Sequence, residues 1–471
     1  MQWKNHSPGA SAAQDIPEGV AASGDLDLPA PTSLQETGLS PLFLMELALK
    51  VIHYGSPTAK RIAHILGLPP PLAKQLLVEL EERRLCEVTG AVEVVTGNYY
   101  YRLTEKGRER LQEALGRNRY AGAVPVTLDH YIAVMQKVLR RRPAADAATV
   151  DRALSHLVLH SEVAESLKRA LVSGRHAMLF GPSGNGKTEI LLSFAQHSGG
   201  TMLVPQAIYS HGQVIRVFDP AIHVPVSTEA NPPYPEAVVA ESEAPLLKST
   251  QDNHDRRWIR VKTPAVMAGG ELGEDDLELT WDSWARFSQA PIHLKVQGGI
   301  LIIDDFGRQK IRPEEVFNRW IMPLERGWDY LTLHTGEKIA VPFAVTLLFS
   351  TNLEPRELVH EAFLRRLPYK VPIPSPSPEE FREIVCRQCA EMNVEYTEYA
   401  IDYAVEKVYH GDGGEPRGCL PRDLITIIVE NAHYDGIRPA LTQESLDLAW
   451  HLYFLDGFPN PTHSHRADAP W

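Results

Sequence analysis

Cysteine is scarce in this chain: four residues among 471 are too few for a disulfide-stabilised scaffold, which favours a reducing compartment. Long apolar runs are also missing, so no segment reaches the roughly 18 residues of a membrane-spanning helix. The N-terminus lacks the charged and apolar regions of a signal peptide. A net charge of −13 argues against a whole-molecule binder of polyanions. These absences predict a soluble, cytoplasmic protein with no membrane span. The length of 471 residues allows two to four domains of about 100–200 residues each.

The two ends of the chain have compositions that do not support a packed core. Residues 1–38 are rich in Ala, Pro, Gly, Ser and Asp, and their one cation is Lys4. Such a segment buries too little apolar area to offset the entropy of ordering it. We therefore expect disorder over residues 1–38 and a flexible tail over residues 456–471.

Residues 39–118 have the pattern of a small helical domain with a β-ribbon. Apolar residues at helical spacing, with prolines and glycines between the segments, predict three helices, two short strands and a closing helix. The expected segments are 41–55, 58–66, 69–85, 86–88, 99–103 and 104–115. This order resembles a winged helix-turn-helix domain, and the stretch Leu103-Thr104-Glu105-Lys106-Gly107-Arg108 is typical of the end of the wing.

Charge gives a weak indication of what this domain contacts. Residues 41–120 hold 12 basic and 9 acidic side chains, so the domain is near +3 in a chain whose total is −13. That asymmetry favours nucleic acid. The presumed recognition helix, however, mixes both signs of charge, whereas a duplex reader usually has a cleaner basic face. Its charged residues are Lys74, Arg83 and Arg84 with Glu79, Glu81 and Glu82. DNA and protein therefore both stay open as partners of the winged helix.

The most specific motif is the P-loop pattern GxxxxGK[ST], which follows the strand candidate 178–180 and precedes the helix candidate 189–197. Its glycines let backbone N–H groups wrap phosphates, and the helix N-terminus adds partial positive charge. Lys187 is expected to reach the β- and γ-phosphates, and Thr188 to ligate Mg²⁺ through its hydroxyl. The predicted nucleotide-binding residues are Gly181, Pro182, Ser183, Gly184, Asn185, Gly186, Lys187 and Thr188.

A P-loop needs a carboxylate at the end of a neighbouring strand to hold the metal ion. Residues 298–305 supply one, because four apolar residues there are followed by Asp304 and Asp305. We expect Asp304 to hold Mg²⁺, directly or through water, and Asp305 to polarise the attacking water. Two aspartates that end a buried strand are unfavourable without a cation, so a pair of mere surface acids is the weaker interpretation.

A third apolar strand candidate, 345–351, ends in the amide of Asn352. The order of P-loop, acidic strand end and strand-terminal Asn, followed by a helical region, resembles the AAA+ ATPases. The resemblance implies an α/β P-loop NTPase core at 151–372 and a C-terminal helical lid at 373–455, joined to the winged-helix domain by a linker at 119–150. It also implies ATP and Mg²⁺ as cofactors, and a homo-oligomeric ring that we expect to be a hexamer.

The same resemblance implies roles for individual side chains. Asn352 falls at the sensor-1 position, where an amide orients the lytic water beside the γ-phosphate. Arg365 or Arg366, which the sequence does not separate, falls at the arginine finger, which reaches the ATP of the neighbouring subunit. Arg422 falls at the sensor-2 position in the lid, with Arg417 as the fallback.

Three features depart from the family pattern or extend it. The second acid is usually Glu in this family and is here Asp305, one methylene shorter, which puts the turnover rate rather than nucleotide binding in question. Residues 205–295 form an insertion that lengthens the path from the P-loop to the acidic strand. Residues 330–341 predict a hairpin that turns at Thr335-Gly336. It resembles a hairpin that faces the central pore of a ring in one branch of the family, and a plain surface hairpin is the alternative.

Two weaker patterns are open to ordinary structural interpretations. Cys386-x-x-Cys389 with Cys419 invites a zinc or redox site, but the first two lie in one helix candidate and no second pair is near, so packing is favoured. The stretch His156-Leu157-Val158-Leu159 resembles the part that packs on adenine in AAA+ proteins, although these residues also suit a core.

Two functions from different classes remain. The leading interpretation is an ATP-hydrolysing AAA+ protein that assembles into a ring and remodels an unidentified macromolecular partner. The alternative is a DNA-binding regulator whose winged helix reads DNA and whose ATPase acts as an assembly switch. A metabolic kinase is disfavoured, because sensor and finger residues act in an assembly.

Overall fold

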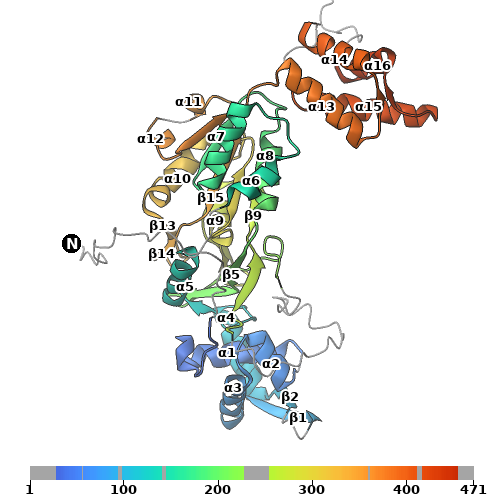
Figure 1. Cartoon of the computed structure of the whole chain (residues 1–471). Helices are drawn as coiled ribbons and strands as arrows, with labels where there is room; N and C mark the ends of the chain where they lie inside the picture. The colour runs from blue at the N-terminus through green and yellow to red at the C-terminus, as the bar shows by residue number, and fades with distance from the viewer. Residues whose placement is uncertain are drawn as a thin grey trace, which may run out of the picture.

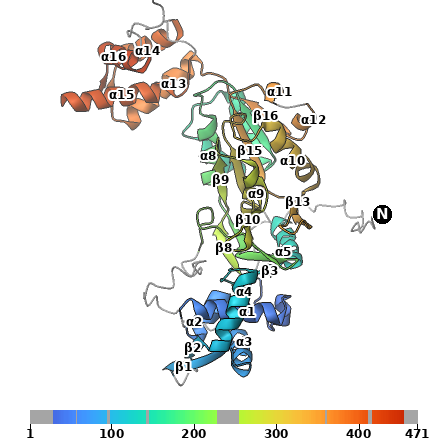
Figure 2. The same ribbon diagram turned by 180° about the vertical axis from the view of Figure 1, so that it is seen from behind.

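The computed structural model describes residues 28–55, 57–93, 98–140, 145–226, 254–358, 361–410 and 416–454. The first 27 residues and the tail predicted at 456–471 lie outside these ranges. Figures 1 and 2 show three parts in a row: N-terminal helices at one end, an α/β body in the middle and C-terminal helices at the other end.

The N-terminal part has three helices, a hairpin and a fourth helix, in the order expected for a winged helix-turn-helix domain. Side-chain hydroxyls cap the N-termini of three of these helices. Ser40, Thr58 and Thr104 each accept a hydrogen bond from the backbone N–H three residues later. The strands β1 and β2 pair antiparallel. Membership of the winged-helix class stays a prediction. The elements are η1 (Gln35–Thr37), α1 (Pro41–His53), α2 (Ala59–Leu66), α3 (Pro70–Glu82), β1 (Cys86–Glu93), β2 (Asn98–Leu103) and α4 (Glu105–Arg117).

The predicted disorder at the N-terminus is wrong for residues 28–38. The Leu28 carbonyl accepts a hydrogen bond from the Asp255 N–H at 2.7 Å, and the side chains of Leu28 and Leu34 are buried. The prediction rests on the composition of the whole segment, which is mostly polar and small, and so gives no weight to these two leucines. Each of them packs into a different hydrophobic cluster.

The middle part is built on a parallel five-stranded sheet with the strand order β16-β4-β15-β12-β9. Alternate side chains of a strand point to opposite faces. Leu301 and Ile303 accordingly enter one hydrophobic cluster, while Ile300 and Ile302 enter another on the opposite face. The strands are β4 (Ala177–Phe180), β9 (Ala265–Ala268), β12 (Ile300–Ile303), β15 (Thr346–Thr351) and β16 (Tyr369–Pro372).

Helices cover both faces of this sheet, which gives the mixed α/β architecture that the sequence predicts. Side chains of α6, α7 and α8 pack into the cluster on one face, and those of α10 pack into the cluster on the other. The first of these helices begins at Ala147, a few residues before the predicted domain boundary. The bounds are α6 (Ala147–Leu154), α7 (Ser161–Val172), α8 (Lys187–His197), α9 (Ile292–Lys295), α10 (Pro313–Arg326), α11 (Pro355–Leu358) and α12 (Glu361–Leu364).

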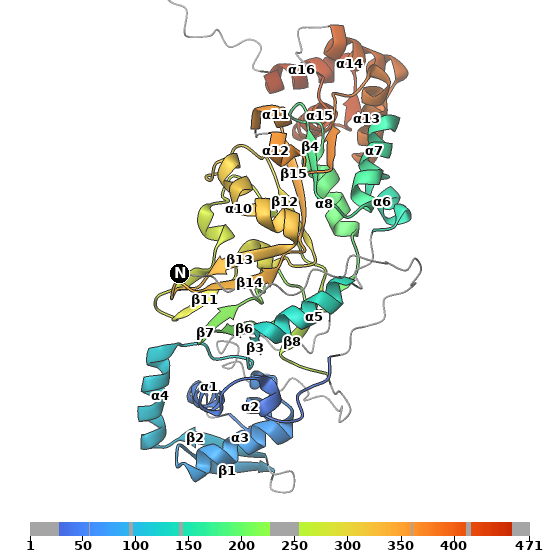
Figure 3. The same cartoon turned by 90° about the vertical axis from the view of Figure 1, so that its left-hand side faces the viewer.

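A second sheet, with the strand order β10-β11-β7-β6-β3, lies between the central sheet and the N-terminal part (Figure 3). The predicted insertion at 205–295 supplies most of it. That boundary is wrong at 265–268, because this short segment, which has a single β-branched residue, is the edge strand β9 of the central sheet. The elements are β5 (Thr201–Pro205), β6 (Ala207–Ser210), β7 (Gln213–Arg216), β8 (Trp258–Lys262), η3 (Glu274–Leu277), β10 (Thr280–Asp282) and β11 (Phe287–Gln289), with β5 and β8 paired antiparallel.

The expectation of a linker at 119–150 is wrong in part. The strand β3 (Val126–Thr127) pairs parallel with β6 and forms the edge of the second sheet. The helix α5 (Leu128–Arg140) follows it and buries Tyr131, Val134 and Met135. A two-residue strand leaves no periodic pattern in a sequence, which explains why the segment resembles a connector.

A hairpin lies at the predicted position, with β13 (Trp328–Thr332) paired antiparallel to β14 (Lys338–Pro342). One face of it is buried with the second sheet through Leu331, Ile339 and other apolar side chains. Its tip also contacts that sheet: the His334 ring stacks on Trp281 with 4.3 Å between centroids, and Gln213 Nε2 donates to Thr335 Oγ1 at 3.1 Å. The hairpin is therefore packed against the insertion, and an orientation toward a pore stays a prediction.

The N-terminal part and the second sheet share one hydrophobic core. Phe43 of α1 packs against Tyr209 of β6 with 4.7 Å between ring centroids, and Tyr120 packs edge-on against Phe287 of β11 at 5.8 Å. The Arg119 N–H donates to the carbonyl of Ala285 at 2.8 Å. The second sheet thus has the N-terminal part on one side and the hairpin on the other.

The C-terminal part is a four-helix domain with a core of its own. Ser377 begins its first helix in a capping box with Glu380. No helix in the described ranges is long and apolar enough to cross a membrane. The elements are α13 (Pro378–Glu391), β17 (Glu395–Tyr396), α14 (Glu398–His410), α15 (Leu420–Asp435), β18 (Ala440–Leu441) and α16 (Gln443–Phe454).

Candidate nucleotide-binding site

The P-loop connects β4 to α8, in the strand–loop–helix context that the motif requires. Gly181, Gly184 and Gly186 have φ angles of 136°, 82° and 77°, in the region that favours glycine. A Cβ on Gly181 would lie 2.3 Å from the carbonyl oxygen of Ile373. The loop therefore requires glycine both for its backbone conformation and for its close approach to the chain that follows β16.

Lys187 is the first residue of α8 and is 6% exposed. Its Nζ donates to the carbonyl oxygens of Gly181 at 2.8 Å and Pro182 at 2.7 Å. Burial lowers the pKa of Lys187, and the carboxylates of Asp305 and Asp304 counteract that effect. The ammonium group is thus held inside the curve of the loop and interacts with both aspartates.

Asp304 directly follows β12 and contacts the P-loop helix. Thr188 Oγ1 donates to Asp304 Oδ1 at 2.8 Å, and the Ser350 hydroxyl of β15 donates to the same oxygen. The two predicted metal ligands are therefore neighbours, and both offer oxygen, the ligand atom that Mg²⁺ prefers. Sequence reasoning missed Ser350, because a serine in a buried strand has no signature until the pairing of β12 with β15 is known.

Asp305 and Asn352 are also brought together, because Asn352 Nδ2 donates to Asp305 Oδ1 at 3.0 Å. Asp305 has a φ of +48°, a conformation that Asp and Asn adopt more readily than longer residues. Gln309, a second residue that sequence reasoning missed, fixes this turn by donating to the Asp304 carbonyl at 2.8 Å. Asn352 therefore orients the carboxylate of Asp305, and Gln309 holds the backbone of the same turn.

The structure distinguishes the two candidate finger arginines. The Arg365 side chain is 75% exposed and pairs with the exposed Glu361 one helical turn earlier. The Arg366 side chain is 25% exposed and pairs with Glu325 of α10. Arg366 is thus tied to its own subunit, whereas Arg365 extends into solvent.

The two candidate sensor-2 arginines also differ. Arg422 is 65% exposed and pairs with its neighbour Asp423. Arg417 lies against the P-loop instead: a Cβ on Gly184 would be 3.4 Å from Arg417 Cβ and 2.8 Å from Cys419 Sγ. The geometry therefore places the fallback candidate Arg417 beside the phosphate loop, whereas Arg422 is exposed.

The predicted adenine segment lies where the C-terminal helical domain meets the α/β body. Arg387 of α13 directs Nη1 to the carbonyl oxygens of Ser155, His156 and Leu157 at 3.4, 3.2 and 3.4 Å. Leu157 packs at the margin of the cluster that covers one face of the central sheet. Contact with adenine stays a prediction, and Arg387 links the segment directly to the C-terminal helical domain.

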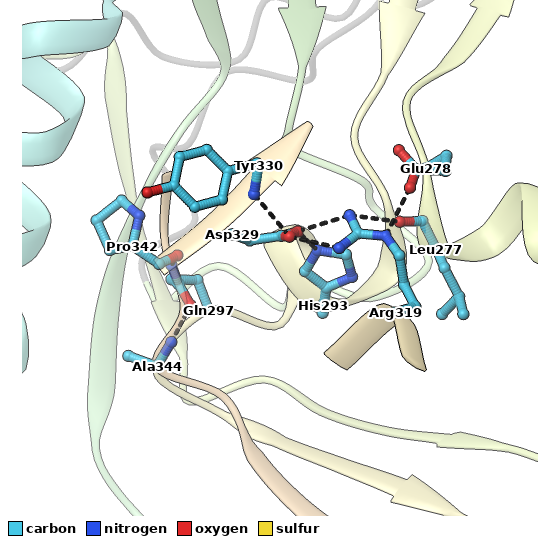
Figure 4. Close-up of polar contacts among 9 residues, drawn as sticks. All are labelled: Leu277, Glu278, His293, Gln297, Arg319, Asp329, Tyr330, Pro342 and Ala344. Carbon is cyan, nitrogen blue, oxygen red and sulfur yellow. Dashed lines mark hydrogen bonds and ion pairs between the residues drawn. The ribbon is translucent and has the colours of Figure 1, made fainter. Parts of the chain in front are cut away.

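A buried polar cluster joins the hairpin to α10, the helix that follows the acidic strand end (Figure 4). Asp329 of β13 accepts hydrogen bonds from His293 Nε2 at 2.7 Å and from Arg319 Nη2 at 2.9 Å. Arg319 also donates to Glu278. Burial alone raises the pKa of Asp329, but the hydrogen bonds from His293 and Arg319 outweigh burial and hold it at about 2. Asp329 is therefore an anion that fixes the hairpin to the body.

The cysteines do not assemble into a metal site within the described residues, where no group of three or more His, Cys, Asp or Glu side chains could hold an ion. Cys389 is buried in the core of the C-terminal helical domain, and burial raises the pKa of its thiol to about 11. Burial also raises the pKa of Cys419, beside the P-loop.

Comparison with known proteins found a family described as "Domain of unknown function (DUF8689)", which matches residues 377–452 and so corresponds to the C-terminal helical domain. A search of curated proteins found no similar sequence. Among solved structures, the RuvB Holliday junction branch migration motor of Thermotoga maritima is similar at 13% identity with a TM-score of 0.35, over 62% of this chain and 70% of that chain. NtrX from Brucella abortus in complex with ADP is similar at 13% identity with a TM-score of 0.36, over 72% of this chain and 60% of that chain.

Proposed function

We propose that this chain binds ATP with Mg²⁺ and hydrolyses it, as a P-loop NTPase of the AAA+ type. The observation that carries the proposal is the meeting of three strand ends: the P-loop after β4, Asp304 and Asp305 after β12, and Asn352 after β15. Because these strands are parallel, their C-terminal ends lie at one edge of the sheet, beside the N-terminus of α8. That edge offers donors for phosphate oxygens next to acceptors for a cation.

The Thr188 hydroxyl and the Asp304 carboxylate suit Mg²⁺, because Mg²⁺ prefers oxygen ligands and these two oxygens lie 2.8 Å apart. Thr188 and Asp304 would hold the cation, and its charge would offset the negative charge of the phosphates. Lys187 donates to the β- and γ-phosphates. Asp305, oriented by Asn352, accepts a proton from the attacking water while the water oxygen bonds to the γ-phosphorus. The bond to the bridging oxygen breaks, and ADP and phosphate leave.

The remaining cation at the γ-phosphate is supplied by a neighbouring copy. Arg365 extends into solvent rather than toward its own subunit, as a residue that acts in trans requires. We assign the finger to Arg365 and a structural role to Arg366. A ring, expected to be a hexamer, places each Arg365 at the next site.

The partner that ATP hydrolysis remodels is best sought at the N-terminal domain. That domain is continuous with the second sheet and the hairpin, so movement of the body reaches it through packed elements. Two basic side chains beside the presumed recognition helix and on the hairpin pair with acids: Arg83 with Glu79, and Arg102 with Glu87. This pairing favours a protein partner over DNA, and the DNA-binding regulator is the alternative that the assay below tests.

The first experiment measures ATP hydrolysis as a function of protein concentration, with and without duplex DNA. We expect specific activity to rise with concentration, because the site is completed between subunits, and Lys187→Ala to abolish turnover. Unchanged turnover in Lys187→Ala would refute the assignment of the P-loop. Stimulation by DNA would favour the regulator.

Mixing variants tests the trans assignment. Arg365→Ala and Lys187→Ala should each be inactive alone and should recover part of the activity when mixed, because some interfaces then combine an intact P-loop with an intact finger. Arg366→Ala is the matched control and should retain hydrolysis. Recovery with Arg366→Ala in place of Arg365→Ala would transfer the finger to Arg366.

A further inference from the structure

Asn185 is a P-loop residue whose side chain has no part in the roles assigned above, yet it is only 8% exposed. Its amide oxygen accepts a hydrogen bond from the Gly418 N–H at 3.0 Å, and its Nδ2 donates to Ser375 Oγ at 3.4 Å. Ser375 lies in the hinge segment between β16 and α13, and Gly418 lies in the turn before α15. One side chain of the phosphate loop therefore contacts both the hinge and the lid.

The same turn of the lid is held by the residue before Asn185. The Cys419 N–H donates to the carbonyl of Gly184 at 2.7 Å. The packing there is close, because a Cβ on Gly184 would lie 2.8 Å from Cys419 Sγ, nearer than such atoms normally approach. The peptide units of Gly184 and Asn185 thus cannot rotate without moving the 417–419 turn or breaking these hydrogen bonds.

We propose that Asn185 is a positioning residue that couples the conformation of the phosphate loop to the position of the helical lid. The inference rests on the proposed nucleotide site, because phosphate binds the backbone N–H groups of this same loop. When those peptide units orient toward phosphate, the Gly184 carbonyl and the Asn185 amide move with them, and the 417–419 turn follows. The turn carries Arg417, so the coupling also sets how closely that cation approaches the site.

Only an amide can make both of the hydrogen bonds seen at this position. Asn185 uses an acceptor toward the Gly418 N–H and a donor toward the Ser375 hydroxyl, whereas a carboxylate has no N–H to donate. The lid does not need Asn185 in order to fold, because α13 to α16 enclose their own core. Loss of Asn185 should therefore uncouple the lid from the loop and leave the lid folded.

The test follows hydrogen exchange of the Gly418 and Cys419 amides in the full chain, with and without ADP and Mg²⁺. We expect ADP to change their exchange in the wild type. In Asn185→Ala, Gly418 should exchange about five- to tenfold faster and lose its response to ADP. Asn185→Asp keeps the acceptor and should retain the protection of Gly418. Gln388→Ala removes an amide of α13 that donates to Glu391 within the same helix, and it should behave like the wild type.

Kinetics separate positioning from nucleotide contact. We expect Asn185→Ala to bind ADP within about threefold of the wild type while kcat falls about tenfold, since the lid no longer follows the loop. A loss of ADP affinity beyond tenfold, with the lid response intact, would make Asn185 a nucleotide ligand and overturn the proposal.

The proposal and the proposed function fail in different ways. Wild-type protein that binds ADP without any change at Gly418 and Cys419 overturns the coupling alone. Wild-type protein that binds no nucleotide overturns the proposed function, and the coupling with it.

Discussion

Lys50 of α1 is 1% exposed in the core that the N-terminal domain shares with the second sheet, and its Nζ donates to Asn118 Oδ1 at 2.7 Å. Burial lowers its pKa to about 8; Glu46 opposes this shift and Arg117 adds to it. The folded state therefore disfavours the charged ammonium. We predict that Lys50→Met stabilises the protein at pH 7.

The magnitude follows from the pKa. A fall from 10.5 to about 8 corresponds to about 3 kcal/mol of unfavourable free energy at pH 7, at about 1.4 kcal/mol per unit. Loss of the hydrogen bond to buried Asn118 offsets about 1 kcal/mol of the gain. Glu46 stays paired with Arg110 and Arg117. The net stabilisation should be about 2 kcal/mol.

The shifted pKa of Lys50 also makes the free energy of unfolding depend on pH. Unfolded Lys50 loses its proton near pH 10.5 and folded Lys50 near pH 8, so the unfolded state binds more protons between these values. Wild-type stability therefore gains from this group as pH rises from 8 to 10.5, and the advantage of Met declines over the same range.

The assay is urea unfolding of the full chain at pH 7 and pH 10, followed by far-UV circular dichroism. Lys74→Met, at an exposed position on α3, is the matched control and should change stability by less than about 0.5 kcal/mol. Destabilisation by Lys50→Met at pH 7, or an effect that is the same at both pH values, would refute the reasoning.

Three further predictions concern other buried or oriented groups. Asp305→Asn keeps the shape and suits the left-handed backbone, so nucleotide affinity should stay within about threefold while kcat falls about 100-fold or more; equal turnover would exclude Asp305 as the base. Asp329→Asn should lower the free energy of unfolding by about 3 kcal/mol, because Arg319 and His293 lose a buried anion, whereas Glu278→Gln should change it by less than about 1 kcal/mol in the same urea titration. Burial lowers the pKa of His176 to about 4, so the unfolded chain binds a proton below pH 6.5 that the folded chain does not. The stability that neutral His176 gives the fold is therefore present above pH 6.5 and is lost as pH falls from 6.5 to 4. His176→Gln should flatten the pH profile of the free energy of unfolding in that range by up to about 3 kcal/mol, and an unchanged profile would contradict the prediction.

The residues of the candidate nucleotide site follow from the sequence, because phosphate and metal binding demand particular residues in contiguous motifs. Lys187, Thr188 and Asp304 each follow from a pattern of a few residues, and the structure places them together. Ser350 could not be predicted, since only the register of β12 against β15 brings its hydroxyl to Asp304. The sequence could not separate the adjacent residues Arg365 and Arg366 either. They differ in the direction of the side chain, because Arg365 is exposed and Arg366 pairs with Glu325.

The second sheet was beyond sequence reasoning for a different reason. Its edge strand β3 is two residues long and pairs with β6, about eighty residues later, so no local periodicity marks it. The same holds for Leu28 and Leu34, whose burial depends on partners in distant segments. Local patterns predict elements well here, whereas contacts between distant short elements require the folded chain.

The shared core of the N-terminal domain has a consequence for how the protein is made. Phe43 and Tyr120 pack against Tyr209 and Phe287, which leave the ribosome long after the N-terminal helices. At about 5–20 residues per second, synthesis from Tyr120 to Phe287 takes about ten to thirty seconds. During that interval Phe43 and Tyr120 lack these two aromatic partners, so the nascent N-terminal helices present an apolar surface that only the later strands cover.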